Sequence, residues 1–434
     1  MLKDRGDFAE EIMRIFPEES PSGEPKSVLT FTFQVTTDCS LCCTYCYQTN
    51  KGHEMMTWDV AKAAIDYAFD SANDHDSIFS YDFVSGIIVD FIGGEPLLNI
   101  DLVTQIIDYF EEQLVLRDSP WLFKHRYSFS TNGVAYFDDK VQSLLAKYGD
   151  LISMGVTVDG HKELHDKCRV FCNGHGSYDL AIKASLDQKN RFGNDSTKIT
   201  LCPENIDETS RAIIHMLNLG YRYIHANCVF EEGWEPVHAR TLYQEMKQIG
   251  DYILDNDLED SCYVSLFGEN DFSPLTDEDT SNWCGGVGSM IAVDYKGDFY
   301  PCIRYMESSI GKDRKPLIIG NIHDGAYKTA KTKKIKEAFS RVTRQSQSEQ
   351  SCIDCPIASG CAWCSGYNYQ KYGTVNKRAT FICVMHKARA LGSWYYFKKE
   401  AKKKGADHKI ELFLPENDAI ALIGEKEWSF LCNV

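Results

Sequence analysis

The chain has 434 residues, of which 43% are hydrophobic and 25% charged, and its formal net charge is −17. That length exceeds what one core usually fills, so we expect two domains. The acidic balance argues against general nucleic-acid binding, because phosphate contacts need a surplus of lysine and arginine. No stretch approaches the roughly 18 apolar residues of a membrane span, and the first residues lack a signal-peptide core. We therefore expect a cytoplasmic protein with no membrane partner.

Short apolar strands alternate with helical stretches over residues 29–257, a pattern typical of parallel βαβ units. Strands are predicted at 29–36, 86–94, 127–133, 152–160, 198–205 and 223–230. Helices are predicted between and after them in DVAKAAIDYAFDSA, with Thr57 as its cap, and in LVTQIIDYFEEQL, KVQSLLAKY, SYDLAIKASLDQ, ETSRAIIHMLNLG and ARTLYQEMKQIGDYIL. Six such units predict an α/β fold, a partial (β/α)6 barrel of the TIM type, with ligands at the carboxyl ends of its strands.

The composition changes after residue 257. Residues 258–283 are acidic and rich in turn formers, which predicts a linker. Residues 284–390 are predicted to form a smaller module that is dense in cysteine. Residues 391–434 hold a basic helix and an apolar tail, interpreted as a packing appendage with a solvated lysine face, and residues 1–28 are predicted to be an N-terminal extension.

Seventeen cysteines favour metal binding over disulfides, because their number is odd and nothing directs the chain to an oxidising compartment. Ten of them have iron–sulfur spacing. The front group is Cys39, Cys43 and Cys46, and the rear group is Cys284, Cys302, Cys352, Cys355, Cys361, Cys364 and Cys383. Three thiolates cannot close a cubane of four irons, so the remaining iron of the front group would bind a ligand that is not protein.

Simpler interpretations exist for both groups. The front triplet could be a reduced buried cluster or a zinc site, and CxxCx5CxxC in the rear group could be a zinc ribbon. The other seven cysteines are Cys42, Cys168, Cys172, Cys202, Cys228, Cys262 and Cys432. Free packing cysteines are the expected interpretation for these seven. A role for Cys168 and Cys172 in holding a substrate thiol stays open, because they flank Arg169 near the barrel mouth.

The motif CxxxCxxC followed by Tyr47, then GGEP at 93–96 and STNG at 130–133, resembles the radical S-adenosylmethionine enzymes. The resemblance covers nearly the whole chain. In that family the three cysteines hold a [4Fe-4S] cluster whose fourth iron chelates the amino and carboxylate groups of the cofactor. One electron then cleaves the cofactor to a 5′-deoxyadenosyl radical, which takes a hydrogen from the substrate.

Cofactor-binding residues follow from the resemblance. Gly93 and Gly94 would let the backbone approach the methionine ammonium, and Glu95 would accept a hydrogen bond from it. The resemblance also implies that Ser130 and Asn132 contact the ribose, that Arg169 pairs with the cofactor carboxylate and that Tyr47 is among the cofactor-binding residues. A plain strand-to-helix turn, a helix cap or an exposed side chain is the simpler alternative at each position.

The rear cysteines resemble the SPASM domain, the twin-cluster extension of radical S-adenosylmethionine enzymes that modify peptides and proteins. By that resemblance Cys352, Cys355, Cys361 and Cys383 complete one auxiliary [4Fe-4S] cluster. Cys284, Cys302 and Cys364 begin the other, which either recruits a ligand such as Cys262 or keeps an open iron; the whole protein would hold three clusters. The spacing of two residues between Cys361 and Cys364 departs from the usual three.

Within this group two subfamilies compete. Anaerobic sulfatase maturases carry an aspartate base where this chain has Ile303, which argues against formylglycine formation. The segment TFQVTTDCSLCCTYCYQ is similar to the corresponding segment of maturases of CXXX-repeat peptides, which form thioethers. The resemblance implies a ribosomally made precursor peptide and a flavodoxin- or ferredoxin-type electron donor as partners. Leader recognition would come from a separate leader-binding protein, the C-terminal tail or another surface of the chain. A multi-cluster electron carrier and a zinc-bound binding module are the alternatives from other classes.

Overall fold

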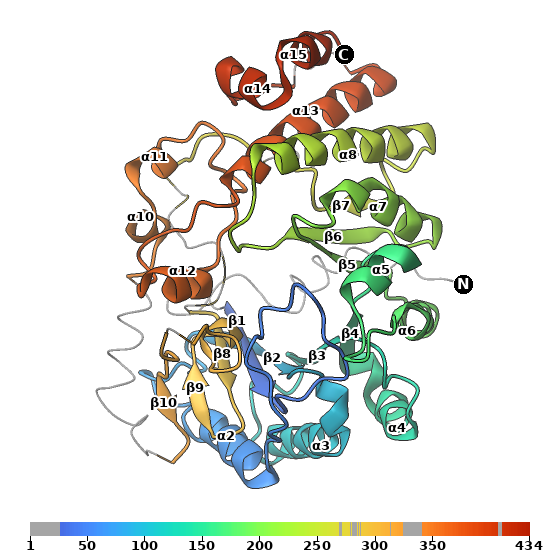
Figure 1. Ribbon diagram of the computed structural model, residues 1–434. Helices are drawn as coiled ribbons and strands as arrows, with labels where there is room; N and C mark the ends of the chain where they lie inside the picture. The colour runs from blue at the N-terminus through green and yellow to red at the C-terminus, as the bar shows by residue number, and fades with distance from the viewer. Residues whose placement is uncertain are drawn as a thin grey trace.

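The computed structural model describes residues 27–434 except 269–270, 278, 280–283, 285, 287, 313, 324–340 and 407–409. Its first part is a series of parallel strands joined by helices (Figure 1). The strands are β1 (Ser27–Gln34), β2 (Val84–Ile92), β3 (His125–Thr131), β4 (Ile152–Val156), β5 (Ser196–Leu201) and β6 (Tyr223–Cys228). The helices are α2 (Trp58–Asp70), α3 (Ile100–Leu116), α4 (Asp139–Tyr148), α5 (Lys162–Cys168), α6 (Tyr178–Phe192), α7 (Thr209–Asn218) and α8 (Pro236–Asp255). All six predicted strands and all six predicted helices are confirmed.

Local signals explain much of this order. Thr57 caps α2 as predicted, because its side chain accepts a hydrogen bond from the backbone N–H of Val60. Helix α5 was not predicted; it has only seven residues, fewer than periodicity can define.

Two sheets make the barrel wall. One has the strand order β10-β9-β8-β1-β2-β3-β4 and the other has the order β5-β6-β7, where β7 is Tyr263–Val264. Neighbouring strands from β1 to β4 and from β5 to β7 are parallel. The two sheets meet where Asn194 Nδ2 donates to the backbone oxygen of Met154 at 3.1 Å. The partial barrel predicted from the sequence is therefore confirmed.

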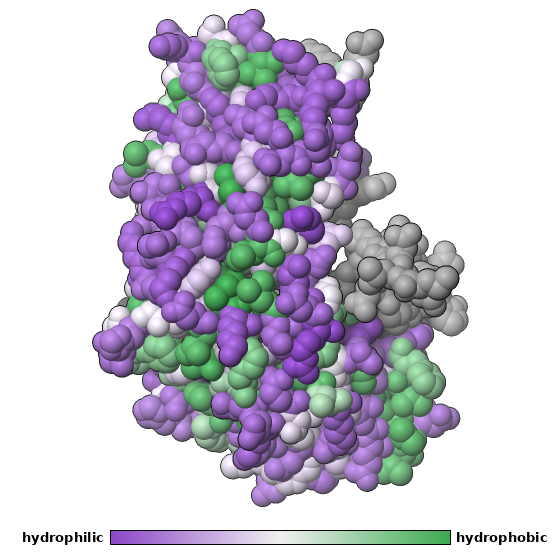
Figure 2. Space-filling model, turned by 90° about the vertical axis from the view of Figure 1, so that its right-hand side faces the viewer, coloured by the Kyte–Doolittle hydropathy of each residue, from purple (hydrophilic) through white to green (hydrophobic). Residues whose placement is uncertain are grey.

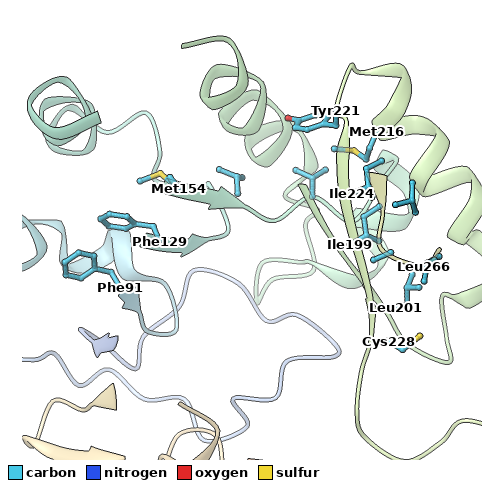
Figure 3. Close-up of a cluster of buried hydrophobic side chains, with 14 of the residues drawn as sticks. Phe91, Phe129, Met154, Ile199, Leu201, Met216, Tyr221, Ile224, Cys228 and Leu266 are labelled. Carbon is cyan, nitrogen blue, oxygen red and sulfur yellow. The ribbon is translucent and has the colours of Figure 1, made fainter. Parts of the chain in front are cut away.

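The two faces of the second sheet differ in chemistry. Ile199, Leu201 and Ile224 are buried toward the helices, where Figure 3 shows them with Met216 and Tyr221. The alternate residues Lys198, His225 and Asn227 are exposed on the inner face. Closed barrels fill their interior with side chains, so this polar, open inner face marks the part of the barrel that is available to a ligand.

The rear module shares the barrel's sheet. Strand β8 (Met290–Val293) pairs in parallel with β1, and the antiparallel strands β9 (Asp298–Tyr300) and β10 (Gly320–Asn321) extend that edge. Short helices follow: α10 (Arg344–Gln347), α11 (Gln350–Ile353) and α12 (Ser365–Tyr372). The boundaries proposed for the linker and the module stay predictions, although β7 lies inside the proposed linker and packs on β6.

Three helices end the chain. Helix α13 (Cys383–Lys404) packs along α8, and α14 (Glu416–Ile423) and α15 (Glu425–Cys432) follow it (Figure 1). Glu427 accepts hydrogen bonds from Tyr243 and Lys247 of α8. These contacts agree with the interpretation of this segment as a packing appendage.

The molecular surface shown in Figure 2 is mostly hydrophilic, with smaller hydrophobic areas between the polar side chains. In the part of the chain that the structure describes, no helix combines the length and the apolar character that a bilayer crossing requires.

Candidate functional site

The loop after β1 carries the front cysteines and lies at the carboxyl end of that strand. Cys39, Cys43 and Cys46 are each half-buried. Lys51 Nζ donates to the backbone oxygen of Leu41 at 3.2 Å, and its ammonium interacts with all three thiols. Burial raises the pKa of Cys39 and Cys43. The structure therefore brings the three predicted ligands together around one cation.

Gly93 and Gly94 lie where β2 ends, against the backbone of this loop. A Cβ on Gly93 would lie 2.5 Å from the Thr36 oxygen, and one on Gly94 would lie 2.1 Å from the Asp38 oxygen. The backbone N–H groups of Gly94 and Glu95 donate to these same two oxygens, at 3.1 and 2.8 Å. Glycine is required because the end of the strand and the cysteine loop meet here without room for a side chain.

Glu95 is 1% exposed and its carboxylate already has three donors. It accepts hydrogen bonds from Thr131 Oγ1 at 2.6 Å, from the backbone N–H of Asn132 at 2.8 Å and from that of Leu97 at 3.2 Å. Burial raises the pKa of Glu95. The side chain thus joins the ends of β2 and β3, and its hydrogen bond to a cofactor stays a prediction.

The two predicted ribose contacts have different surroundings. Ser130 is exposed on the inner face of β3. Asn132 is 4% exposed, and its Nδ2 lies 3.0 Å from Ser40 Oγ and 3.9 Å from Cys39 Sγ. Asn132 therefore orients the cysteine loop, whereas Ser130 is free to face a ligand.

Arg169 is buried beside the front thiols. Its Nη1 donates to Tyr45 Oη at 2.9 Å, and the Tyr45 hydroxyl donates to the carboxylate of Asp159. Asp159 is fully buried and also accepts a hydrogen bond from the backbone N–H of Thr200 at 3.1 Å. Among the described residues nothing binds Arg169 Nε, and its charge acts on Cys43. A buried guanidinium with an unused N–H fits an anionic group at this position.

Tyr45 and Asp159 were not among the predicted site residues. Asp159 follows β4 in the stretch TVDG, and a polar residue at the carboxyl end of a barrel strand is the signal that would have identified it. Tyr45 lies within the cysteine motif, but the prediction named its neighbour Tyr47 instead. Burial, followed by the Asp159 charge, raises the pKa of Tyr45 well above its ordinary value.

The expectation that Cys42 and Cys172 are free thiols is wrong. They form a disulfide, with both residues exposed. The pairing follows from the register of two segments, because the backbone N–H of Cys42 donates to Val170 and that of Thr44 to Cys168. Sequence distance concealed this contact, since 130 residues separate the two cysteines. The disulfide fixes the front loop to the segment that carries Arg169.

Cys168 lies next to this disulfide and is buried beside Cys202. Hydrogen bonding between the two thiols lowers the pKa of Cys168 and raises that of Cys202. With Cys172 in a disulfide and Cys168 only 3% exposed, neither presents an accessible free thiol to a substrate.

Tyr47 joins the front loop to the rear module. The Arg304 guanidinium lies over the Tyr47 ring, 4.6 Å from its centroid, and pairs with Glu231 at 2.5 Å. Burial raises the pKa of Tyr47. Its aromatic ring therefore has a structural partner, and its predicted contact with the cofactor stays a prediction.

The rear cysteines form two neighbourhoods. The sulfur atoms of Cys284 and Cys302 each lie 3.4 Å from the position that a Cβ on Gly286 would occupy. The charge of the Cys364 thiolate acts on both cysteines. The second neighbourhood consists of Cys352, Cys355, Cys361 and Cys383, whose charges interact at Cys361. This is the division that the SPASM resemblance implies. Cys262 has Arg222 and Glu259 as its charged neighbours, so the structure does not bring it to the first neighbourhood.

Two buried cations accompany the second neighbourhood. The guanidinium groups of Arg344 and Arg378 lie 4.9 and 4.2 Å from the centroid of Trp363, and Arg378 Nη2 donates to Cys361 Sγ at 2.7 Å. Neither arginine forms an ion pair with a described carboxylate, and Arg344 Nε has no hydrogen-bond partner there. Buried cations need an anion, so four thiolates bound to iron fit this neighbourhood.

A single metal ion fits less well. Within the described ranges no three histidine, cysteine, aspartate or glutamate side chains converge as one bound ion would require. Cluster thiolates each bind a different iron, so they need not converge on a point. Three clusters stay a prediction.

Comparisons with known proteins agree with this architecture. Residues 28–179 match a family model described as a 4Fe-4S single cluster domain. An uncharacterised protein of Methanocaldococcus jannaschii is 32% identical over 144 residues, which are 33% of this chain and 43% of that protein. A cysteine-type anaerobic sulfatase-maturating enzyme of Clostridium novyi is 26% identical over 196 residues, 43% of this chain and 46% of that enzyme. The chain spans less than half the length of these curated relatives.

Solved structures share the fold over most of the chain. The enzyme anSMEcpe with bound AdoMet and the Kp18Cys peptide has a TM-score of 0.61 at 15% identity, covering 87% of this chain and 99% of that one. SuiB of Streptococcus suis bound to its precursor peptide SuiA has a TM-score of 0.54 at 14% identity, covering 83% and 76%. The resemblance to radical S-adenosylmethionine enzymes of the SPASM type is therefore confirmed at the level of the fold.

Proposed function

We propose that this protein is a radical S-adenosylmethionine oxidoreductase that modifies a ribosomally made peptide. The observation that carries the proposal is the position of the buried Arg169, whose charge acts on Cys43 of the front triplet and whose Nε has no partner among the described residues. Its support comes from the shared fold, since solved structures with this fold hold AdoMet or a peptide. The site thus has thiols for a cluster and a cation for a carboxylate.

Each front residue has a defined task in this proposal. Cys39, Cys43 and Cys46 hold a [4Fe-4S] cluster, which with S-adenosylmethionine supplies the radical chemistry when both are bound. Arg169 binds the cofactor carboxylate, and Tyr45 fixes the guanidinium from behind. Gly93, Gly94, Glu95 and Asn132 keep the cysteine loop against the strand ends, and Ser130 faces the ribose.

The rear cysteines hold two auxiliary clusters in the same proposal. Arg344 and Arg378 balance the negative charge of the cluster at Cys361, and Arg304 connects this module to Tyr47 of the front loop. The first neighbourhood has three described cysteines, which leaves a position for a substrate thiolate or a further ligand.

We propose thioether formation from a substrate cysteine as the reaction. A sulfatase-maturase reaction is the second candidate, because the Clostridium novyi enzyme and anSMEcpe are both similar to this chain. Ile303 favours the first, since its apolar side chain cannot serve as a base. Mass spectrometry of the product separates them, because thioether formation removes two hydrogens and keeps the sulfur, whereas formylglycine formation from cysteine removes the sulfur.

Iron content and cofactor cleavage test the proposal directly. The reconstituted protein should bind about twelve irons, as three cubanes require, and should release 5′-deoxyadenosine upon reduction. Replacing Cys39, Cys43 or Cys46 with alanine should abolish the release, whereas replacing the exposed Cys432 should leave it unchanged. Release that survives any front substitution contradicts the assignment. Zinc in place of iron would favour the zinc-bound binding module. Iron without release of 5′-deoxyadenosine would favour the multi-cluster electron carrier.

A further inference from the structure

A cavity of about 510 Å³ lies between the second barrel sheet and the rear module. The barrel contributes side chains from β5, β6 and β7, namely Lys198, His225, Asn227 and Tyr263. The rear module contributes Gly360, Ala362 and Ile382. Because these three residues are chain neighbours of Cys361 and Cys383, the cavity borders the second rear neighbourhood.

The barrel end of the cavity lies near the buried network behind the front cysteines. Lys198 on β5 is in register with His225 on β6, and both side chains are exposed on the inner face. The charges of Asp159 and Arg169 act on Lys198, which places the lysine next to the buried network behind the front cysteines. The cavity therefore extends from the inner face of the second sheet, beside this network, to the proposed auxiliary cluster.

Most charged groups along this cavity are already paired. Arg389 donates to the backbone oxygens of Ser265 and Leu266 and lies 3.7 Å from the Asp271 carboxylate. His386 donates to the backbone oxygen of Ile357 at 2.6 Å. Arg389 is therefore not available to a ligand, and His386, whose pKa burial lowers to about 3, adds no positive charge to the wall.

Lys198 differs from the other lining residues. Its ammonium has no hydrogen bond or ion pair with any residue in the described parts of the chain. The nearby Asp159 carboxylate is already used by Tyr45 and Thr200. Burial, followed by the Lys198 charge, lowers the pKa of the His225 imidazole beside it. Among the described residues, Lys198 thus brings to the cavity an ammonium without a direct partner, in a chain whose net charge is −17.

We propose that Lys198, with His225 beside it, binds a carboxylate of the peptide substrate. The proposal rests on the proposed function and adds a substrate class, namely peptides with an acidic side chain or a free C-terminus close to the modified residue. An ammonium in a partly enclosed cavity attracts a carboxylate more strongly than one in open water. The contact would fix the peptide between the two sites that act on it.

Three synthetic peptides provide the test. They are acetyl-Ala-Cys-Glu-Ala-amide, its Gln counterpart, and the Gln peptide with a free C-terminal carboxylate. Equilibrium dialysis against the reconstituted protein with S-adenosylmethionine measures how much of each is retained. We expect the peptides with a carboxylate to be retained about fivefold better than the neutral one. Comparing the Glu peptide with the peptide that has a free C-terminus shows whether the site prefers a side-chain or a C-terminal carboxylate.

Variants assign the preference to the lysine. Lys198→Met should remove it and Lys198→Arg should retain it. Lys183→Met is the matched control, because Lys183 is exposed on the outer helix α6, over the Phe137 ring. Equal retention of all three peptides by the wild-type protein, or a preference that survives Lys198→Met, overturns the proposal. Loss of S-adenosylmethionine from Lys198→Met in the same dialysis also overturns it, because the lysine would then belong to the cofactor.

Cofactor cleavage without peptide keeps the two proposals separate. If the protein releases no 5′-deoxyadenosine but still prefers the carboxylate peptides, the proposed function fails and the carboxylate site remains. If it releases 5′-deoxyadenosine and shows no preference, only the carboxylate site fails.

Discussion

The front and rear cysteine groups lie in contrasting surroundings. The front loop extends from a strand whose large side chains, Phe31 and Phe33, are buried in the main core with Phe91 and Phe129 of the neighbouring strands. Most of the rear cysteines lie among short helices, short strands and loops, whereas Cys364 caps the eight-residue α12 and Cys383 begins α13. Among the described residues, the second hydrophobic cluster there has five buried members, which are Ala292, Tyr300, Cys302, Tyr305 and Met306.

The difference in packing indicates that the two sites acquire their shapes in different ways. Hydrogen bonds from the ends of β2 and β3 hold the front loop, so the barrel can form that site before any cofactor binds. The rear neighbourhood contains Arg344 and Arg378, two buried cations that need negative charge from the thiolates. Metal binding and folding are therefore coupled more strongly in the rear module.

Removing the iron should have the largest effect and should act mainly on the rear region. Chelation should destabilise residues 341–383 locally by about 3 kcal/mol, because two buried guanidinium groups lose their anionic partner. Strands β1–β3 should keep their protection. Hydrogen exchange followed by mass spectrometry, with and without iron under anaerobic conditions, measures both regions at once. Equal loss of protection in the two regions would contradict the proposed coupling.

Gly94→Ala should have the largest effect among single substitutions in the front region. The added methyl group would lie 2.1 Å from the Asp38 oxygen, and separating the loop from the strand should cost about 3 kcal/mol of the free energy of unfolding. Gly155→Ala is the control, because its Cβ would lie 3.5 Å from its nearest neighbour, an ordinary contact. Urea denaturation of both variants measures the difference, and similar midpoints would argue against the close approach.

Tyr45→Phe should have a smaller effect on folding and a specific effect on the site. It leaves the buried Asp159 carboxylate and the Arg169 guanidinium without their shared hydroxyl, at a cost of about 2 kcal/mol. S-adenosylmethionine binding should weaken as well, since Arg169 loses its support. Tyr252→Phe, whose hydroxyl bonds to Asn218 at an exposed position, should change neither quantity. Equilibrium dialysis and urea denaturation measure the two; an unchanged cofactor affinity would separate Tyr45 from cofactor binding.

Acid should lower the stability of both regions by similar amounts, and these amounts should be smaller than the effects described above. Burial, followed by neighbouring arginine charges, lowers the pKa of His165 in the barrel and of His386 in α13 to about 3. Below the ordinary pKa of about 6.5 the unfolded chain takes up protons that the folded chain refuses, so stability falls as the pH drops from there toward 3. The loss should be about 1 kcal/mol per histidine at about pH 5.5.

His165→Asn and His386→Gln should each remove one part of this dependence, because each amide can replace the ring nitrogen that bonds to the backbone. His75→Asn, at an exposed histidine, should leave it unchanged. Unfolding by urea at a series of pH values measures the slope. A slope that persists in both histidine variants would assign it to other groups.

Local patterns in the sequence predicted the fold class correctly and supplied the candidate cluster ligands. Alternating apolar positions identified six strands, and helical periodicity with the Thr57 cap identified the main helices, because both signals depend on residues close together in the chain. Cysteine spacing separated the front and rear groups for the same reason. The grouping of Cys352, Cys355 and Cys361 with the distant Cys383 came from resemblance and agrees with the neighbourhoods in the structure.

Only the tertiary structure decided the contacts between distant segments. It pairs Cys42 with Cys172, places Tyr45 between Arg169 and Asp159, and joins β8 to β1. None of these follows from spacing, because each depends on which strand ends and loops meet at one edge of the barrel. The same holds for Lys198, which by sequence is an ordinary strand lysine. Its unpaired charge toward a cavity arises from the way the rear module closes over the second sheet.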